Sequence, residues 1–384
     1  MPPKIYLIAG ESSGDFIGSK LMQSLTSIMK ADFIGIGGPL MGNQGLTSLF
    51  PISEISLIGF FEIIPHIYKI KKLINQTIKD ITAESPDLLI TIDSPGFTYR
   101  VAEQVRKTNN NLKIIHIVAP SVWAYKPGRA LKYAKIYDHL LALLPFEPPY
   151  FQKVGLDCDF IGHPVLEQKF YDNKATLRNE LKISDSTKVI CVTPGSRKGE
   201  ILRHMPIFLE ALNMVSDKFK DLHVIFVLAN EDQDDLIKKS LKGAKFHFTL
   251  STDRLKSFAI ADTALAKSGT NTLELAASGT SMVVAYKINI VSFFLIKLLI
   301  KVLWISLINI IANKNVIPEF IQFNCNPRAI ATGLINLLTK PQKAQEQLEE
   351  SRKVLDQLGF KNTIKPSDLA AKLIATKFLK HYEL

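Results

Sequence analysis

Two segments rich in glycine, hydroxyl and charged side chains could hold the phosphates of a ligand. In residues 194–200 (PGSRKGE), the glycines let backbone N–H groups approach a phosphate. Ser196 and the forked guanidinium of Arg197 can then bind its oxygens. A solvated basic turn is the alternative. It is less favoured because the segment directly follows an apolar run typical of a buried strand.

The second such segment is residues 267–274 (KSGTNTLE), which lead into a helical pattern. Backbone N–H groups of Ser268, Gly269 and Thr270 could face a diphosphate at the helix N-terminus. The carboxylate of Glu274, one turn further on, could accept hydrogen bonds from ribose hydroxyls. A capping box that starts at Thr270 or the next residue and closes at Glu274 explains the same pattern. The two interpretations are compatible.

Residues 10–15 (GESSGD) join the first apolar run to the first helical pattern. They match neither the Rossmann glycine spacing nor the P-loop. Glu11, Ser12 and Ser13 could face a phosphate or a sugar. A tight turn with Ser13 or Asp15 as the helix cap is an equally good interpretation.

A carboxylate follows a third apolar run, in residues 91–97 (TIDSPGF). Asp93 or Ser94 could cap a helix that begins at Pro95, and spacing alone favours this interpretation. A carboxylate at the carboxyl end of a parallel strand can also serve as a general base.

Nothing in the sequence predicts a metal site or another cofactor. The cysteines Cys158, Cys191 and Cys325 are far apart in sequence and lie in or near apolar runs, so we expect reduced, packed thiols. Residues 157–159 and 232–234 have Asp-x-Asp spacing but no further ligand cluster nearby.

The net charge of +11, from 47 Lys and Arg against 36 Asp and Glu, favours an anionic partner such as phosphate, anionic lipid or nucleic acid. The basic residues are spread along the chain, which argues against nucleic acid. The apolar run at 5–9 is too short for a signal peptide, so we expect a cytosolic protein.

Short apolar runs alternate with helical patterns along most of the chain, which predicts α/β architecture with parallel sheets. Helices are predicted over residues 16–29, 61–81, 99–107 and about 200–219. Strands are predicted over residues 5–9, 33–36, 88–92, 113–118, 140–143, 159–161, 189–193, 223–228, 245–250, 263–266 and 282–286.

The pattern restarts after residue 188, which predicts two tandem Rossmann-like, doubly wound domains with a cleft between them. We place an N-terminal domain at 1–164 and a second domain at 165–365. A C-terminal helix within 366–384 could return to the first domain.

Two further segments are strongly apolar. Residues 288–311 are long enough to cross a bilayer, but Lys297 and Lys301 near the middle make a span costly. Their spacing predicts an amphipathic helix, packed in the protein or lying on a membrane. Residues 58–72 combine apolar side chains with lysines, which fits either interfacial docking or a core helix with a basic end.

Taken in order, the motifs resemble the lipid-A-disaccharide synthase family through nearly the whole chain. The joint order is far more specific than any one motif. The motifs are AGESSGD at 9–15, IDSPGF at 92–97, VAPSVWAY at 118–125, LPFEPPYF at 144–151, FIGHP at 160–164, PGSRKGE at 194–200, SGTNTLE at 268–274 and SLINIIA at 306–312.

The resemblance implies an inverting GT-B glycosyltransferase, in which the domain at 1–164 binds the acceptor and the domain at 165–365 binds the UDP-sugar. The donor would be UDP-2,3-diacylglucosamine, the acceptor 2,3-diacylglucosamine 1-phosphate, and the products the β-1,6-linked lipid A disaccharide 1-phosphate and UDP. It also implies peripheral binding to the cytoplasmic face of the inner membrane. Another UDP-sugar enzyme of this fold, an epimerase or a lipid-intermediate glucosaminyltransferase, is one alternative, and a non-enzymatic basic membrane-binding module is another.

Within this resemblance Asp93 is the expected base, while Arg197 and the segment starting at Ser268 would stabilise the departing UDP. Glu274 would position the ribose. Asn309 matches a polar position that the family has near its site. The sequence leaves acyl-chain preference open, as well as whether the chain forms a homo-oligomer.

Overall fold

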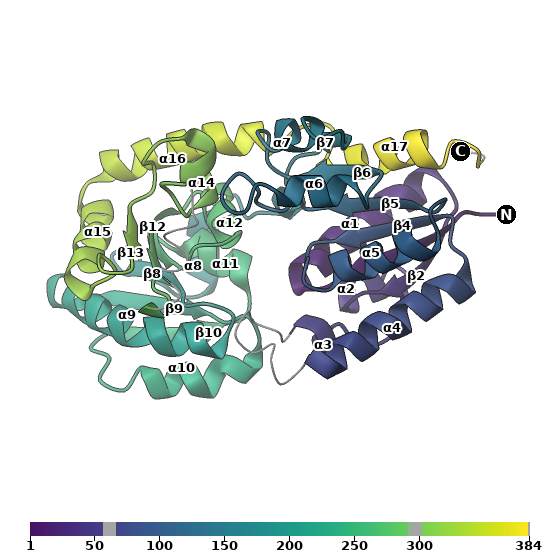
Figure 1. Cartoon of the computed structure of the whole chain (residues 1–384). Coiled ribbons are helices and arrows are strands. Elements are labelled where there is room, and N and C mark those ends of the chain that lie inside the picture. Colours follow the sequence, from purple (N-terminus) through teal and green to yellow (C-terminus); the bar gives the residue numbers. More distant parts are fainter. Residues whose placement is uncertain (57–66, 291–292, 294–301, 383–384) are drawn as a thin grey trace. The chain divides into compact units, whose positions relative to one another are not determined.

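The computed structural model describes residues 1–56, 67–290, 293 and 302–382 (Figure 1). The chain forms two compact units. Unit 1 contains residues 1–167 and 361–384, and unit 2 contains residues 168–360.

Unit 1 is built on a seven-stranded sheet with the order β3-β2-β1-β4-β5-β6-β7. Every strand pair in it is parallel, and the central strands are buried on both faces, as their continuous apolar sequences require. The strands are β1 (Lys4–Ala9), β2 (Asp32–Ile36), β3 (Thr47–Ser48), β4 (Leu88–Ile92), β5 (Lys113–Ile117), β6 (His139–Ala142) and β7 (Cys158–Phe160).

Helices cover both faces of this sheet. One core contains Leu73 of α4 and Val101 of α5, and the other contains Leu25 of α1 and Ile374 of α17. Helix α17 therefore packs in unit 1 although it lies at the end of the sequence. The helices are α1 (Ser12–Ile28), α2 (Pro39–Gly42), α3 (Ser53–Ser56), α4 (Ile67–Glu84), α5 (Thr98–Thr108), α6 (Arg129–Ala134), α7 (Pro148–Gln152) and α17 (Pro366–Phe378).

Polar contacts hold α17 against α1. The hydroxyl of Ser24 donates to Asp368 Oδ1 at 2.7 Å, and the backbone N–H of Ser367 donates to Glu167 Oε1 at 2.7 Å. Lys377 Nζ lies 2.7 Å from Asp159 Oδ2 in β7.

Unit 2 contains a six-stranded sheet with the order β10-β9-β8-β11-β12-β13, again with parallel pairs throughout. Helices α9 and α15 pack on it through Phe208 and Leu334. The strands are β8 (Lys188–Thr193), β9 (Leu222–Val227), β10 (His247–Ser251), β11 (Thr263–Ala266), β12 (Ser281–Tyr286) and β13 (Glu319–Ile321). The helices are α8 (Lys174–Glu180), α9 (Lys198–Lys218), α10 (Asp234–Ser240), α11 (Arg254–Ile260), α12 (Asn271–Ala277), α14 (Leu307–Ala312), α15 (Pro327–Thr339) and α16 (Pro341–Gln357).

The eleven predicted strands are all present, with ends that differ by at most two residues. Strands β3 and β13 were not predicted, and they are edge strands of two and three residues. Helix α1 begins at Ser12 rather than residue 16, so Ser12 and Ser13 lie in its first turn and not in a loop.

The predicted amphipathic helix over 288–311 is wrong at its C-terminal end. Residues 302–306 are not helical, and Ser306 caps the separate helix α14 by accepting from the backbone N–H of Asn309. Lys297, Lys301 and most of the predicted apolar stripe lie outside the described residues, as do residues 58–66 of the other apolar segment. Among the residues that are described, no helix is long and apolar enough to cross a bilayer.

Candidate functional site

The carboxyl edge of the unit 1 sheet brings together two of the predicted segments. Asp93 directly follows β4, and Ser13 lies in the first turn of α1, which follows the neighbouring strand β1. The Ser13 hydroxyl donates to Asp93 Oδ2 at 3.4 Å. Glu11 and Ser12 precede Ser13 at the same edge, half-buried and exposed respectively.

Asp93 has an unusual backbone and a perturbed carboxyl group. Its φ is +52°, and that of Ser94 is +47°, so both residues adopt the left-handed conformation. Burial raises the pKa of Asp93 above its ordinary value, although the backbone N–H of Ser94 and the hydroxyl of Ser13 act in the opposite direction. A carboxylate with a raised pKa accepts a proton more readily, which suits a general base.

The helix-capping alternatives in this region are wrong. Helix α5 begins at Thr98, later than the predicted start at Pro95. The N-cap position is therefore Phe97 and not Asp93 or Ser94, and no side-chain capping bond forms in this described segment. Asp15 does not cap α1. It is buried, and its carboxylate accepts N–H bonds from the first turn of α2 at 2.8–3.0 Å, where the donors are Gly38, Leu40 and Met41.

Gly10 allows the two segments to approach each other, because a Cβ atom there would lie 2.2 Å from the Cβ of Ser94. We therefore expect Gly10→Ala to displace Ser94 and Asp93. It should cost about 1–3 kcal/mol of stability by overpacking and lower kcat by roughly 10- to 100-fold. Gly96→Ala is the matched control, since no described residue other than its chain neighbours has an atom within 4 Å of the added Cβ. Steady-state kinetics and urea unfolding measure both effects, and equal behaviour of the two variants would contradict the prediction.

A buried carboxylate that the sequence analysis did not select ties together the next two strand-end loops. Glu147, 3% exposed, accepts from Trp123 Nε1 at 3.1 Å and from the backbone N–H of Leu144 at 3.1 Å. The Trp123 ring also packs edge-on against Phe146, with centroids 5.2 Å apart. Trp123 follows β5 and Glu147 follows β6, so this contact fixes two loops at the edge where Asp93 lies.

The Glu147 carboxyl group should make stability depend on pH. Burial raises its pKa from 4.5 to about 7, so the fold disfavours the ionised form. Its contribution to stability is fully present below about pH 4.5 and is lost as pH rises through about 7, by roughly 3 kcal/mol.

Glu147→Gln removes this titration. As pH rises from about 5 to about 7.5, the free energy of unfolding of the variant should therefore increase relative to that of the wild type. Urea unfolding at both values measures it. Parallel pH profiles for the two proteins would contradict the prediction.

In unit 2, Arg197 and Glu200 follow β8 at the carboxyl edge of the sheet, and Lys267 follows the neighbouring strand β11. Lys267 Nζ lies 3.1 Å from Glu200 Oε1, and Arg197 Nη1 lies 4.0 Å from the same oxygen. The exposed Ser196 precedes Arg197 and accepts at its carbonyl oxygen from Gln233 Nε2 at 2.8 Å. The structure thus places two cations at adjacent strand ends.

Glu274 lies in the first turn of α12, 3% exposed, and accepts from Arg254 Nη2 and Gln168 Nε2, both at 2.7 Å. Burial raises its pKa above the ordinary value, with Arg254 and Gln168 opposing the shift. The capping-box interpretation is wrong, because the side chain of Thr270 makes no capping bond in this described helix.

The turn before α12 keeps its backbone near the surface. Gly269 and Thr270 are exposed, while the Ser268 hydroxyl donates to the carbonyl oxygen of Ile305 at 2.7 Å. Asn271 Nδ2 donates to Thr193 Oγ1 at 2.6 Å, which links this turn to the end of β8.

The side chain of Asn309 is hydrogen-bonded to neighbouring residues of unit 2. It is fully buried, and its Nδ2 donates to the Ile317 carbonyl oxygen at 2.8 Å and to Glu319 Oε1 at 2.9 Å. Its Oδ1 accepts the backbone N–H groups of Val316 and Ile317. These bonds occupy the amide within its own segment, so we assign Asn309 no direct ligand contact.

The cysteines and the possible metal ligands are the remaining groups considered in the sequence. Cys158, Cys191 and Cys325 are buried free thiols, as predicted. No group of three or more His, Cys, Asp or Glu side chains within the described ranges could hold a metal ion.

Comparison with known proteins decides the family. A family model described as lipid-A-disaccharide synthetase (LpxB) matches residues 5–373. The chain is 61% identical to the lipid-A-disaccharide synthase of Rickettsia bellii (strain OSU 85-389), over 98% of this chain and 100% of the relative. It is 58% identical to that of Rickettsia prowazekii (strain Madrid E), again over 98% and 100%.

The chain belongs to the lipid-A-disaccharide synthase family. It is therefore a glycosyltransferase of lipid A biosynthesis, and the motif-based prediction of family and enzyme class is confirmed.

Solved structures confirm the GT-B-like fold of this family member. A co-structure of Staphylococcus aureus MnaA with UDP matches with a TM-score of 0.69 at 14% identity, covering 100% of this chain and 98% of that one. The calicheamicin glycosyltransferase CalG4 matches with a TM-score of 0.60 at 10% identity, covering 100% of both chains. These identities are low, so the likeness concerns the fold alone.

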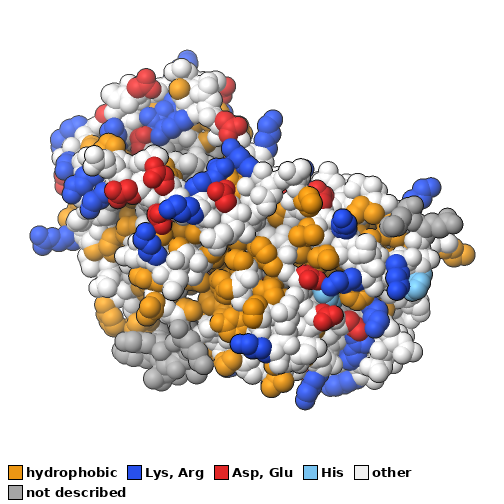
Figure 2. Space-filling model, turned by 90° about the horizontal axis from the view of Figure 1, so that it is seen from above, with side chains coloured by type: hydrophobic (Ala, Val, Ile, Leu, Met, Phe, Trp, Pro, Cys, Tyr) orange, Lys and Arg blue, Asp and Glu red, His pale blue; other side chains and the backbone are white. Residues whose placement is uncertain are grey.

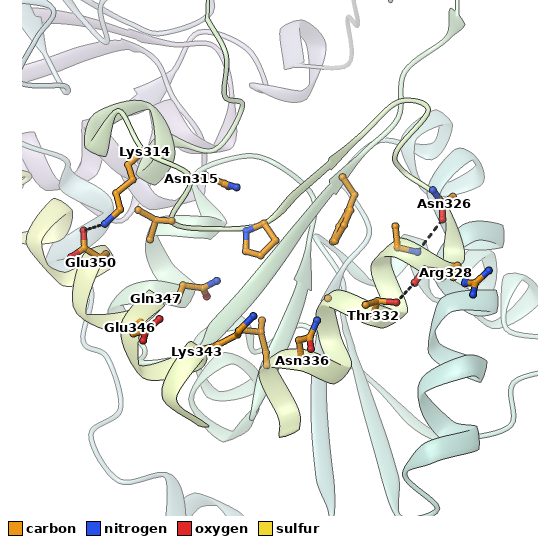
Figure 3. Close-up of a pocket in the computed structure, with 16 residues that line it drawn as sticks. Lys314, Asn315, Asn326, Arg328, Thr332, Asn336, Lys343, Glu346, Gln347 and Glu350 are labelled. Atoms are coloured by element: carbon orange, nitrogen blue, oxygen red, sulfur yellow. Dashed lines mark hydrogen bonds and ion pairs between the residues drawn. The ribbon is translucent and has the colours of Figure 1, made fainter. Parts of the chain in front are cut away.

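A cavity of about 780 Å³ lies in unit 2 (Figure 3). It is formed by α15, α16 and the segment from Lys314 to Phe320, and none of the predicted site residues lines it. Lys314 at its rim pairs with Glu350 at 3.1 Å. The cavity therefore provides no support for the predicted site.

Basic side chains do not gather into one stripe on the face of the molecule shown in Figure 2. Lys and Arg are scattered there among Asp and Glu.

Proposed function

We propose that this chain transfers a 2,3-diacylglucosaminyl group from its UDP derivative to the 6-hydroxyl of 2,3-diacylglucosamine 1-phosphate. The products are the β-1,6-linked disaccharide 1-phosphate and UDP, with inversion at the anomeric carbon. The observation that carries the proposal is family membership over residues 5–373. The charged side chains at the strand ends support it: a carboxylate in unit 1 and cations in unit 2.

The proposed reaction is a single displacement. The acceptor O6 attacks the anomeric carbon, and a new C–O bond forms as the bond from that carbon to the β-phosphate oxygen breaks. The electron pair of the broken bond leaves with UDP, and the O6 proton passes to the carboxylate of Asp93. The raised pKa of Asp93 and its Ser13 contact support this assignment.

Unit 2 is assigned to the donor in this proposal. Arg197 and the backbone of the Ser268–Thr270 turn stabilise the charge that develops on UDP. Glu274 is assigned to the ribose hydroxyls. Because Arg254 and Gln168 already hold its carboxylate, the side chain is fixed in orientation before the nucleotide arrives.

Both proposed substrates carry acyl chains, so we assign the protein to the cytoplasmic face of the inner membrane as a peripheral enzyme. The described part of the 58–72 segment supports this, because the first turns of α4 carry the exposed Tyr68 together with Lys69, Lys71 and Lys72. Flotation with anionic liposomes tests the assignment, and binding that survives charge reversal of the three lysines would count against it. We make no assignment of oligomeric state.

Release of UDP tests the central proposal. It should require the diacylated donor and the diacylated acceptor phosphate together, and a chelator should leave it unchanged. An epimerase of the same fold would instead convert the donor sugar without any acceptor. Turnover of UDP-sugar alone would therefore refute the transferase proposal for this chain.

A further inference from the structure

Lys267 lies where three adjacent strands of the unit 2 sheet end. It follows β11, and its backbone N–H donates to the carbonyl oxygen of Thr193 at the end of β8 at 3.1 Å. Its ammonium group lies 5.6 Å from the ring centroid of Tyr286, the last residue of β12. Ligands of parallel α/β sheets bind at this carboxyl edge.

Glu200 holds the Lys267 side chain in place. Glu200 is 9% exposed, and its Oε1 lies 3.1 Å from Lys267 Nζ. Its buried Oε2 has no hydrogen-bond partner among the residues that the structure describes. A Cβ at Gly195 would lie 2.8 Å from that oxygen, so the carboxylate packs closely against the turn that follows β8.

The cations near Glu200 govern its ionisation. Burial acts to raise the pKa of Glu200, but Lys267 and Arg197 outweigh burial and hold the pKa below its ordinary value. Glu200 is therefore an anion placed between two cations, and the three groups together carry a net positive charge at the strand ends.

We propose that Lys267 is a second cationic ligand of the nucleotide diphosphate beside Arg197, and that Glu200 is the residue that positions it. This inference rests on the proposed function. Arg197 is the one cation predicted from the sequence for the diphosphate, which carries more negative charge than one guanidinium can balance. Lys267 is 21% exposed at its side chain and is already fixed by Glu200, so little ordering is needed when the diphosphate binds.

Calorimetric titration with UDP and with uridine tests the inference in the full-length protein. Lys267→Met should weaken UDP binding by roughly 10- to 100-fold, the usual range for one charge-assisted contact. Uridine binding should stay within about twofold of wild type, because uridine lacks the diphosphate. The UDP-to-uridine affinity ratio is thus the readout, and a general structural defect would not lower it selectively.

Lys314→Met is the matched control. Lys314 also pairs with a glutamate at 3.1 Å in unit 2, and that glutamate, Glu350, likewise contacts a second cation, Lys353. The control should leave the UDP-to-uridine ratio unchanged.

A double variant protects the test against misfolding, because Lys267→Met leaves the buried Glu200 without its nearest cation. Glu200→Gln combined with Lys267→Met removes both charges and should show the same selective loss of UDP affinity. Glu200→Gln alone keeps the ammonium group but releases it, so it should lower the ratio by a smaller factor. A wild-type ratio in the double variant would overturn the inference while leaving the proposed function intact. Absence of UDP binding by the wild-type protein would overturn both.

Discussion

Asp93→Asn is expected to lower kcat by roughly 10²- to 10⁴-fold, the range for loss of a positioned general base. The substitution is close to isosteric, and Asn tolerates the left-handed backbone at this position, where φ is +52°. The Ser13 hydroxyl can still donate to the remaining side-chain oxygen, which it approaches at 3.4 Å in the native protein. The fold should therefore survive, so the loss would report on proton transfer. Initial rates of UDP release with both acylated sugars measure it.

The pH dependence provides a second readout of the same variant. Wild-type turnover should fall as pH decreases through the pKa of Asp93, which burial raises above its ordinary value. Residual turnover of Asp93→Asn should lack this acidic limb.

Asp87→Asn is the matched control for Asp93→Asn, because the two aspartates flank the same strand β4 at opposite edges of the sheet. Asp87 accepts the backbone N–H of Lys4 at 2.7 Å, a bond that the amide oxygen of Asn can also accept. The control should retain near-normal turnover. Near-normal turnover of Asp93→Asn with a native circular dichroism spectrum would remove Asp93 from the mechanism.

The sequence predicted the sheets well because their signal is local. A buried parallel strand such as β4 or β11 is a continuous apolar run, and both were located to the residue. Positions at strand ends follow from this, so Asp93 and Arg197 could be selected without knowing any side-chain contact. The edge strand β13 has only half-buried side chains and three residues, so no comparable run marks it.

Residues whose importance depends on distant partners could not be predicted in this way. Glu147 contacts Trp123, 24 residues away, and Lys267 contacts Glu200 from the next strand of the sheet. In each case the sequence shows a charged residue beside an apolar run, which fits an exposed side chain equally well. Asn309 is a similar case, because the sequence does not show the four hydrogen bonds that its side chain makes with residues 316–319.

Arg197→Ala is expected to lower kcat by roughly 10²- to 10³-fold, the usual cost of removing one donor to a developing anion. The Arg197 side chain is 55% exposed, and its Nη1 lies 4.0 Å from Glu200 Oε1. Ion pairs of side chains this exposed add little to folding, so the free energy of unfolding should change by only about 0.5 kcal/mol. Single-turnover kinetics and urea unfolding of the same preparation separate the two quantities.

Two further variants separate the contribution of the guanidinium's shape to turnover from the contribution of its charge. Lys198→Ala removes an exposed cation from the adjacent position and should have a small effect on turnover. Arg197→Lys retains the charge but loses the planar fork that binds two phosphate oxygens, so its kcat should lie between those of wild type and Arg197→Ala. Equal losses in Arg197→Ala and Lys198→Ala would show that the loop acts through its overall charge, and the specific assignment of Arg197 to the departing diphosphate would then be wrong.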